Sequence, residues 1–273
     1  MKKIAACSLL LLLGLMGCTP DDKPADHATL HDNSLETVKR SGFLRWGADV
    51  VGGEPYVSED QKNPGTYIGF EVDIAASIAK QLGVKPKLII TPWDNLIPAL
   101  QRGDFDMAIN GIESTEDRSK IIMLSEPYFI YSQQITIRKG TQGINSLEDL
   151  KGKKVATLSG TAAEDLLRAI PQIQVQINPE VIYSYRDLEN GKVDAVVLDS
   201  PIAAAFGATN PKLQNIGEPF GEGIYVIAFR KDQILLKNAV NNILQQIKAN
   251  GELKGIYEKW KMMSPQQEKI GIR

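Results

Sequence analysis

Two stretches of the sequence, LQRGDFDMAI at residues 100–109 and LENGKVDAVV at residues 188–197, share one layout. In each, the end of a helical pattern is followed by a glycine, a polar residue, an apolar residue, an aspartate and an apolar run typical of a buried strand. A helix–glycine–strand unit is common in α/β proteins, so coincidence is the alternative to duplication. Duplication would give two similar lobes, one centred on each strand.

Short strands and helices alternate from Leu35 onward, the pattern of an α/β fold with mostly parallel sheets. Strands are expected at 42–50, 85–91, 105–111, 130–140, 153–160, 175–183, 193–200 and 223–231. Helices are expected at 69–83, 95–103, 146–152 with Ser146 as cap, 161–170, 184–191, 235–250 and 251–261. The segment at 130–138 is too extended for a turn. If 130–138 carries the chain from one lobe into the other, 223–229 would carry it back, and two such crossings form a hinge.

The start of the chain has the pattern of a targeting signal. A positive MKK precedes an apolar run, Ile4 to Met16, that is too short to span a bilayer. The run leads into Leu-Met-Gly-Cys, which resembles the bacterial lipobox and implies a lipoprotein signal peptide at 1–18 with lipidation of Cys18. An ordinary signal peptide with an incidental cysteine is the alternative. The polar residues 19–34 are expected to form a flexible tether.

Composition excludes several kinds of site from the body of the chain. The formal net charge is −2 without a long basic run, which argues against a nucleic-acid partner. The second cysteine, Cys7, lies in the signal, and both histidines, His27 and His31, lie in the tether. Ser-His-Asp triads, Cys-His nucleophiles and most zinc sites are therefore ruled out. We expect no metal, no cofactor and a monomer.

Arg118 is unusual for its place in the sequence. Ser114 and Thr115 are N-cap types followed by two acids, and the first helical turn favours anions over a cation. Arg118 would suit an external anion, and the alternative is a surface arginine paired with Glu113 or Glu116. We expect Arg118→Ala to cost little stability without ligand, because it removes a cation from a positive helix end.

A second anion site is predicted at LSGTAAED, residues 158–165, where a strand leads into a helix. Backbone N–H groups at Thr161 and Ala162 are free in such a turn. Together with Arg118 from the other lobe they could clamp one carboxylate. Asp199, which ends a buried strand, would then accept from a cation, unless it forms an Asx-turn before the next proline. A site that binds one carboxylate and, through Asp199, one cation matches the two charged groups of an α-amino acid.

Six blocks of the sequence together resemble the family 3 solute-binding proteins of amino-acid ABC transporters. They are GFEVDIAASIAKQLG, WDNLIPALQRGDFDMAINGIESTEDR, SEPYF, SGTAAEDL, NGKVDAVVLDSP and NGELKGIYEKW, in the family's order. The resemblance implies an α/β, type II periplasmic-binding-protein fold. Its two lobes, residues 35–128 with 226–273 and residues 129–225, would be joined by two hinge strands around a cleft.

The resemblance also implies roles for individual residues. The α-carboxylate of the ligand would be held by Arg118, by main-chain groups of Gly111 and Ala162, and by Thr161. The α-ammonium would be bound by Asp199. Trp93 stands where the family often has an aromatic wall, and Asp49 stands where members often place an acid near the ligand.

Three departures from the family pattern stand out. Glu113 replaces a Ser or Thr that often contacts the α-ammonium, which adds a second carboxylate. An extra residue in DVVGGEPY puts Gly53 where the family has an aromatic, so either Tyr56 supplies that wall or nothing does. Leu158 occupies a position that is polar in some glutamine-binding members of the family, which argues against glutamine as the ligand.

These expectations describe a binding protein, not an enzyme. It would be lipid-anchored in the cell envelope, at the periplasmic or extracellular face, and would deliver an amino acid to an ABC permease. A periplasmic dehydratase of cyclohexadienyl carboxylates shares the fold and is the alternative, with Glu113 as general acid if its pKa were raised. A sensory or cell-wall-associated lipoprotein would usually need extra domains.

The side chain of the ligand is predicted from the charges of the cleft. One cation, Arg118, faces three acids, Asp49, Glu113 and Asp199, and the α-ammonium needs only one of them. A buried carboxylate without a partner is costly. We therefore predict arginine or lysine over glutamate, with glutamine between, and the ligand side chain on Trp93. If Glu113 turns outward and pairs with a lysine, a neutral ligand is favoured instead.

Overall fold

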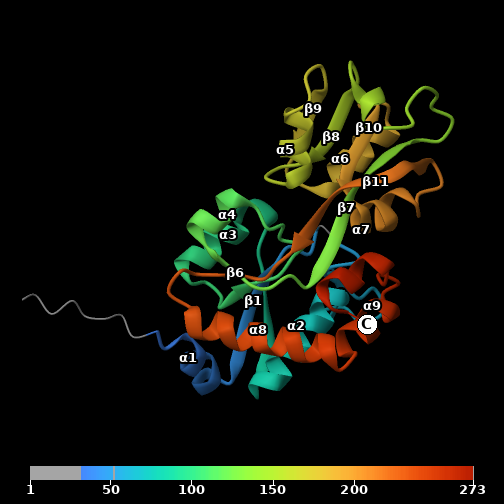
Figure 1. Ribbon diagram of the computed structural model, residues 1–273. Coiled ribbons are helices and arrows are strands. Elements are labelled where there is room, and N and C mark those ends of the chain that lie inside the picture. Colours follow the sequence, from blue (N-terminus) through green and yellow to red (C-terminus); the bar gives the residue numbers. More distant parts are fainter. Residues whose placement is uncertain (1–31, 52, 273) are drawn as a thin grey trace, which may run out of the picture. The chain divides into compact units, whose positions relative to one another are not determined.

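The computed structural model describes residues 32–51 and 53–272, and these contain two five-stranded sheets (Figure 1). We call the sheet formed mainly by the first half of the chain, with its helices, lobe 1, and the other sheet, with its helices, lobe 2. The expected signal peptide with Cys18, and residues 19–31 of the expected tether with both histidines, lie outside the described residues.

Lobe 1 holds the strands β1 (Phe43–Ala48), β4 (Lys85–Ile90), β5 (Met107–Ala108), β6 (Met123–Leu124) and β12 (Ala228–Phe229). Their order is β4-β1-β5-β12-β6, beside a separate hairpin of β2 (Ser58–Glu59) and β3 (Tyr67–Ile68). The helices are α1 (Ser34–Ser41), α2 (Phe70–Leu82), α3 (Trp93–Arg102), α4 (Glu116–Ile121), α8 (Ile234–Ala249), α9 (Glu252–Lys259) and the 3₁₀ segment η3 (Pro265–Ile270).

Lobe 2 holds the strands β7 (Phe129–Arg138), β8 (Lys154–Leu158), β9 (Gln174–Asn178), β10 (Ala195–Asp199) and β11 (Leu213–Tyr225). Its helical segments are η1 (Glu148–Leu150), α5 (Ala162–Arg168), α6 (Val181–Glu189), α7 (Ser200–Ile202) and η2 (Ala203–Gly207). The strand order β9-β8-β10-β7-β11 repeats the arrangement of lobe 1: three parallel strands, then one strand antiparallel to both of its neighbours, then an edge strand parallel to the first three.

The two crossings between the lobes run side by side. Strands β7 and β11 form one antiparallel ladder that starts with Phe129 opposite Tyr225. At its lobe 1 end the Tyr128 N–H donates to the Tyr225 carbonyl at 3.0 Å, and the Val226 N–H donates to the Ile112 carbonyl at 2.9 Å. Because β7 in lobe 2 and β12 in lobe 1 each run antiparallel to both of their neighbours, both sheets are mixed, whereas the sequence suggested mostly parallel sheets.

The sequence echo corresponds to an equivalent local structure in both lobes. Asp106, before β5, accepts from the Arg45 N–H at 2.8 Å, and Asp194, before β10, accepts from the Lys154 N–H at 2.9 Å. Each aspartate thus satisfies a backbone donor of the neighbouring parallel strand. The glycines at 103 and 191 follow the ends of α3 and α6 with φ values of 85° and 72°, which L-residues rarely adopt.

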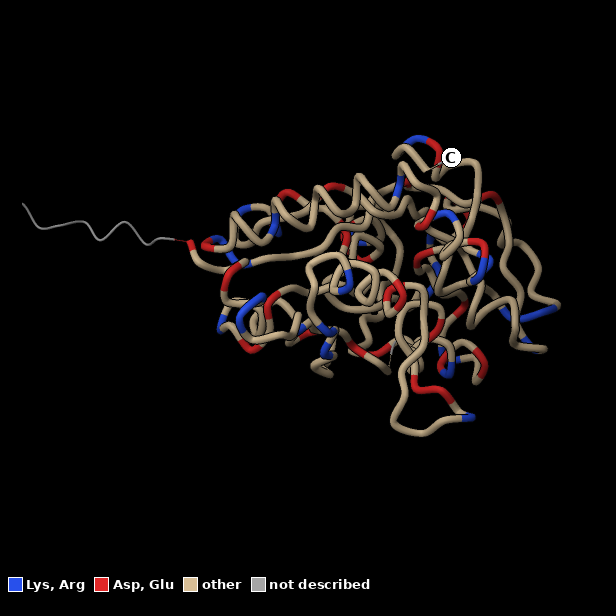
Figure 2. The backbone as a smooth tube through the Cα atoms, turned by 90° about the horizontal axis from the view of Figure 1, so that it is seen from below, with Lys and Arg blue, Asp and Glu red and all other residues tan. Residues whose placement is uncertain are grey.

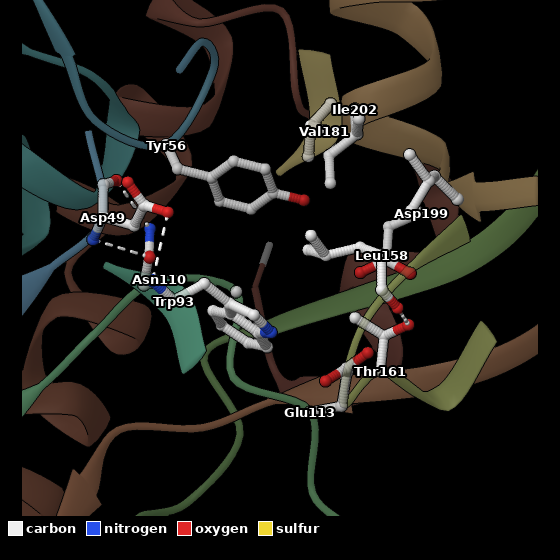
Figure 3. A pocket seen from close by; sticks show the side chains of 12 residues that line it. Asp49, Tyr56, Trp93, Asn110, Glu113, Leu158, Thr161, Val181, Asp199 and Ile202 are labelled. Atoms are coloured by element: carbon white, nitrogen blue, oxygen red, sulfur yellow. Dashed lines mark hydrogen bonds between the residues drawn. The ribbon is translucent and has the colours of Figure 1, made fainter. Parts of the chain in front are cut away.

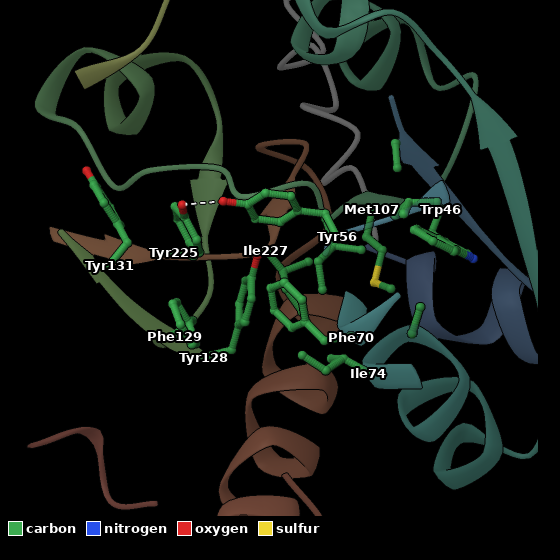
Figure 4. Packing of buried hydrophobic residues seen from close by; sticks show 14 of the residues in the cluster. Trp46, Tyr56, Phe70, Ile74, Met107, Tyr128, Phe129, Tyr131, Tyr225 and Ile227 are labelled. Atoms are coloured by element: carbon green, nitrogen blue, oxygen red, sulfur yellow. Dashed lines mark hydrogen bonds between the residues drawn. The ribbon is translucent and has the colours of Figure 1, made fainter. Parts of the chain in front are cut away.

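An aromatic cluster fills the space where the crossing strands meet lobe 1 (Figure 4). Tyr225 of β11 stacks between Phe129 and Tyr131 of β7, with ring centroids 5.7 and 4.6 Å apart. Phe129 and Tyr257 meet edge to face at 5.3 Å, and Tyr257 is fully buried. Offset and edge-to-face aromatic pairs add about 0.5–1.5 kcal/mol each beyond area burial. The cluster therefore fixes the crossing strands against lobe 1.

Two predicted boundaries are wrong. The body begins before Leu35, because α1 starts at Ser34 and Asp32 accepts from the Leu235 N–H of α8 at 2.5 Å. The strand expected at 175–183 ends at Asn178, and its last three residues start α6. The last correction concerns a cap: Ser146 lies one residue before the N-cap position of η1.

Charged residues of both signs are interspersed along the traced chain (Figure 2). Within the part of the chain that the structure describes, no helix is both long and apolar enough to span a membrane.

Candidate functional site

A pocket lies where the carboxyl ends of the parallel strands of both sheets approach each other, as expected for open α/β sheets. About 520 Å³ of space not occupied by protein atoms, part of it open solvent, lies within this pocket. Its lining comprises Asp49, Tyr56, Trp93, Asn110, Gly111, Glu113, Leu158, Thr161, Val181, Leu198, Asp199 and Ile202 (Figure 3). Seven of the nine predicted binding residues are in this set.

The other two predicted residues, Arg118 and Ala162, both contact the carboxylate of Glu113. Arg118 Nη1 donates to Glu113 Oε2 at 2.5 Å, and the Ala162 N–H donates to Glu113 Oε1 at 2.9 Å. The side chain of Glu113 is 1% exposed and that of Arg118 13%. The clamp formed by one guanidinium and one helix N-terminal N–H thus holds a carboxylate, and this carboxylate belongs to the protein.

The pairing of Arg118 with Glu113 is the alternative that the sequence left open. It corrects the surplus of acids inferred for the cleft, because Glu113 has its cation within lobe 1. It also excludes, for the structure described, an outward Glu113 paired with a lysine. Of the three acids, Asp49 and Asp199 are left without a salt-bridge partner among the described residues.

Further side-chain hydrogen bonds join the lobes around this clamp. Arg118 Nη2 donates to the Gly160 carbonyl at 2.8 Å, and the indole Nε1 of Trp93 donates to the Ser159 carbonyl at 2.8 Å. Ser159 Oγ donates to Asp94 Oδ1 at 2.6 Å. The Arg118 guanidinium also lies 5.4 Å from the centre of the Trp93 ring, within cation–π range. Trp93 is therefore both a wall of the pocket and a contact between the lobes.

Asp199 lies on the lobe 2 side of the pocket, at the end of β10, and is 6% exposed. It accepts from Gln133 Nε2 at 2.8 Å and from the Tyr225 hydroxyl, which is itself 2.7 Å from the Tyr56 hydroxyl. It makes no capping bond to the following helix, so the predicted Asx-turn alternative is not present. Burial, with the nearby charge of Glu113, raises the pKa of Asp199 to about 8.

Asp49 lies on the opposite side of the pocket and caps a helix. Its Oδ2 accepts from the Trp93 N–H, the first of α3, at 3.2 Å, and its Oδ1 accepts from the Val51 N–H at 2.8 Å. A carboxylate at a helix N-terminus is stabilised by the macrodipole. Asn110, which the sequence analysis missed, fixes this arrangement by accepting from the Asp49 N–H at 2.9 Å. Since a carboxylate has about four acceptor sites, Asp49 can accept further bonds from a ligand.

The N–H of Gly111 is not directed to a ligand carboxylate as expected. It donates to Oε1 of Glu71 at 2.7 Å, and the Tyr128 hydroxyl donates to the same oxygen at 2.5 Å. Glu71 is fully buried, and its other oxygen has no hydrogen-bond partner. Burial raises the pKa of Glu71 to about 7 from its ordinary value of 4.5, although both hydrogen bonds oppose the rise. Glu71 therefore holds the main chain at Gly111, a residue that lines the pocket.

Thr161 contributes more to the fold of its loop than expected. Its hydroxyl donates to the Leu158 carbonyl at 2.8 Å and accepts from the Glu164 N–H at 3.3 Å as the N-cap of α5. Tyr56 lines the pocket. Of the two alternatives that the insertion in DVVGGEPY left open, this is the one in which Tyr56 supplies the aromatic wall. Its ring projects into the pocket in Figure 3.

The lobe 2 wall of the pocket is apolar and was largely missed from the sequence. It is formed by Leu158, Val181, Leu198 and Ile202. Val181 and Ile202 belong to α6 and α7, which no motif marked as part of the site. Among residues 32–51 and 53–272, no group of three His, Cys, Asp or Glu side chains is arranged to hold a metal ion.

Comparison with known proteins identifies the family. Residues 50–263 match the model of the bacterial extracellular solute-binding proteins, family 3. The chain is 33% identical over 261 residues to the L-cystine-binding protein TcyJ of Escherichia coli (strain K12), covering 94% of this chain and 97% of that protein.

Solved structures agree with this match. A mutant of ArgBP from T. maritima has a TM-score of 0.78 at 34% identity, covering 84% of this chain and 100% of that one. AncCDT-1, an ancestral amino acid-binding protein and precursor of cyclohexadienyl dehydratase, has a TM-score of 0.77 at 35% identity, covering 83% and 99%. The predicted α/β, type II periplasmic-binding-protein fold is thereby confirmed, and the chain belongs to the bacterial extracellular solute-binding proteins, family 3.

Proposed function

We propose that this protein binds an L-α-amino acid with a basic side chain between its lobes and delivers it to an ABC permease. The observation that carries the proposal is the clamp on the Glu113 carboxylate, made by Arg118 of lobe 1 and the Ala162 N–H of lobe 2. Its donors have the charge and geometry to take the α-carboxylate of a ligand. Named relatives of the chain are amino-acid-binding proteins, including one for L-cystine and one for arginine.

The two remaining acids support a ligand with two positive groups. Asp199, buried beside Gln133 and Tyr225, would take the α-ammonium. Asp49, across the pocket, would take the cationic end of the side chain. The methylene stem would lie between the Trp93 and Tyr56 rings and the apolar wall of lobe 2. With Glu113 paired to Arg118, the argument for a basic ligand rests on Asp49 alone.

Ligand binding would be coupled to closure about the strands β7 and β11. A ligand can stabilise closure only through contacts that differ between open and closed lobes, and the proposed contacts come from both lobes. We further propose that Cys18 carries a lipid that holds the protein in the cell envelope. Binding and delivery, without catalysis, would then be its role.

A thermal-shift panel of the twenty amino acids tests the proposal. At one hundred times its dissociation constant a ligand stabilises by about 2.7 kcal/mol, or about 5–11 °C in Tm for a domain of this size. We expect arginine and lysine to give the largest shifts and glutamate none. Asp199→Asn should lose the shift, and Asp117→Asn, whose side chain is 92% exposed, should keep it. No shift with any amino acid would refute the proposal, and a largest shift with glutamate would refute the basic ligand.

A dehydratase is the second candidate, because a protonated carboxylic acid in the cleft could act as general acid. The observation that favours it is that Asp199, which lines the pocket, has its pKa raised by burial to about 8, a shift that favours the protonated form. One structural neighbour is also a precursor of a cyclohexadienyl dehydratase. Incubation with a cyclohexadienyl carboxylate separates the candidates, since formation of an aromatic product would establish the enzyme and overturn a purely binding role.

A further inference from the structure

Glu113 makes the contacts that an α-carboxylate would make in the clamp. Its two carboxylate oxygens are bound separately, Oε2 by Arg118 Nη1 at 2.5 Å and Oε1 by the Ala162 N–H at 2.9 Å. Arg118 Nη1 also donates to the main-chain carbonyl of Glu113 at 2.8 Å. The carboxylate is therefore held by charge-assisted bonds from both lobes while its own backbone is tied to the same guanidinium.

A tethered carboxylate competes with a free one for the same donors. A ligand with a carboxylate must displace Glu113, and its apparent affinity falls by the fraction of molecules in which the clamp is already filled. The displaced Glu113 would leave its cation while remaining in a buried site, which is unfavourable. A ligand without a carboxylate has neither cost, because Arg118 and Ala162 keep the partner they have.

We propose that Glu113 substitutes in cis for the α-carboxylate of the ligand, so that the cleft also accepts amines that have a second cationic end and no carboxylate. The inference rests on the proposed function, because it uses the same two acids for the two cationic ends. Agmatine, which is arginine without its carboxylate, is the simplest such ligand.

The charges of the pocket match this class of ligand. Arg118 and Glu113 neutralise each other, which leaves Asp49 and Asp199 as the acids facing the space. Figure 3 places these two carboxylates on opposite sides of the pocket, with Tyr56 projecting between them. Between the acids the lining is apolar or aromatic, as a methylene chain requires. A dication with a short aliphatic spacer therefore complements both the ends and the middle of the site.

The charges around Asp199 also favour a cationic ligand without a carboxylate. The charge of Glu113 contributes to the raised pKa of Asp199, and Arg118 opposes it. An ammonium bound at Asp199 favours the ionised carboxylate and relieves this repulsion. A ligand carboxylate in the same cleft would instead add a second carboxylate beside Glu113, whose one cation, Arg118, is already paired.

Calorimetry on the full-length protein with L-arginine and agmatine tests the inference. We expect agmatine to bind the wild type at least as tightly as arginine. In Glu113→Ser the clamp is free, and the ratio of the two affinities should move toward arginine by about tenfold or more, because a charge-assisted hydrogen bond is worth about one to two factors of ten. Glu113→Gln, which keeps the size of the side chain and an acceptor for Ala162, should move it in the same direction.

The matched control is Glu116→Gln, which removes an acid from the same segment at a side chain that is 86% exposed. Its affinity ratio should stay at the wild-type value. If arginine binds the wild type and agmatine does not, or if both Glu113 variants keep the wild-type ratio, the inference is wrong and the proposed function stands. If agmatine binds and no amino acid does, the inference holds and the amino-acid ligand is wrong. If the Glu113 variants fail to fold, the comparison on the wild type decides.

Discussion

Replacing Arg118 by alanine should destabilise the protein even when no ligand is present. The sequence suggested the opposite, because the substitution removes a cation from the start of a helix. In the structure, Arg118 makes hydrogen bonds to the Glu113 carboxylate, to the Glu113 carbonyl and to the Gly160 carbonyl. Alanine would leave a carboxylate that is 1% exposed with only the Ala162 N–H.

The magnitude follows from the burial of this pair. Breaking a buried ion pair by removing one partner costs about 3–5 kcal/mol, because the other charge is left uncompensated. Arg118 is itself 13% exposed, so we take about 3 kcal/mol, which corresponds to about 6–12 °C in Tm for a domain of this size. Removing a cation from the positive end of the helix dipole would offset less than about 1 kcal/mol of this loss in stability.

A double-mutant cycle measured by urea unfolding checks the reasoning. Arg118→Ala should be less stable than the variant that carries both Arg118→Ala and Glu113→Ala, because the second substitution removes the stranded carboxylate. Arg168→Ala, at an arginine 59% exposed and paired only with Glu164 on its own helix, is the control and should change stability by less than about 0.5 kcal/mol. A wild-type unfolding midpoint for Arg118→Ala, or additive effects in the cycle, would refute the role assigned to the pair.

Three further predictions follow from single residues. Because the pKa of Glu71 is raised to about 7 in the folded state, its contribution to stability is fully present below about pH 4.5 and is lost as the pH rises through 7. Glu71→Gln should remove that loss in urea unfolding at pH 5 and 8, and an unchanged difference would contradict it. Trp93→Phe removes the bond to the Ser159 carbonyl and should weaken ligand binding about 3–10-fold in calorimetry, whereas wild-type affinity would count against the contact. Cys18→Ser should release the protein from membranes, and unchanged partitioning into detergent would exclude the lipid anchor.

The fold was largely predictable because its signals are local. Helix stops at Gly83 and Gly103, and the apolar runs of β1, β8 and β10, are read within a few residues of sequence. The echo around Asp106 and Asp194 predicted two equivalent lobes for the same reason. Segments whose form depends on distant partners were missed, such as the first half of β11 and helix α1.

The candidate site was predicted in position but not in its internal pairing. Strand ends and helix starts mark where polar groups gather, which brought seven predicted residues to one pocket. The partner of each group is set by the fold: Asp49 caps a helix 44 positions away, and Gly111 donates to Glu71, 40 positions earlier. No spacing rule connects such pairs, so hydrogen-bonding capacity that looked free in the sequence was already used.

The two lobes contribute different kinds of groups to the contacts between them. Lobe 1 contributes the side chains of Trp93, Asp94, Glu113 and Arg118, whereas lobe 2 contributes backbone atoms of residues 159–162 and one side chain, the hydroxyl of Ser159. Backbone partners do not change with side-chain identity, so we expect substitutions in this loop other than at Ser159 to preserve most of these contacts. Gly160 is a further exception, since its φ of 63° disfavours other residues although a Cβ would meet only Trp93, at 3.9 Å. Under the proposed function, selectivity in the clamp would therefore depend mainly on lobe 1, and there on whether Glu113 or a ligand supplies the carboxylate.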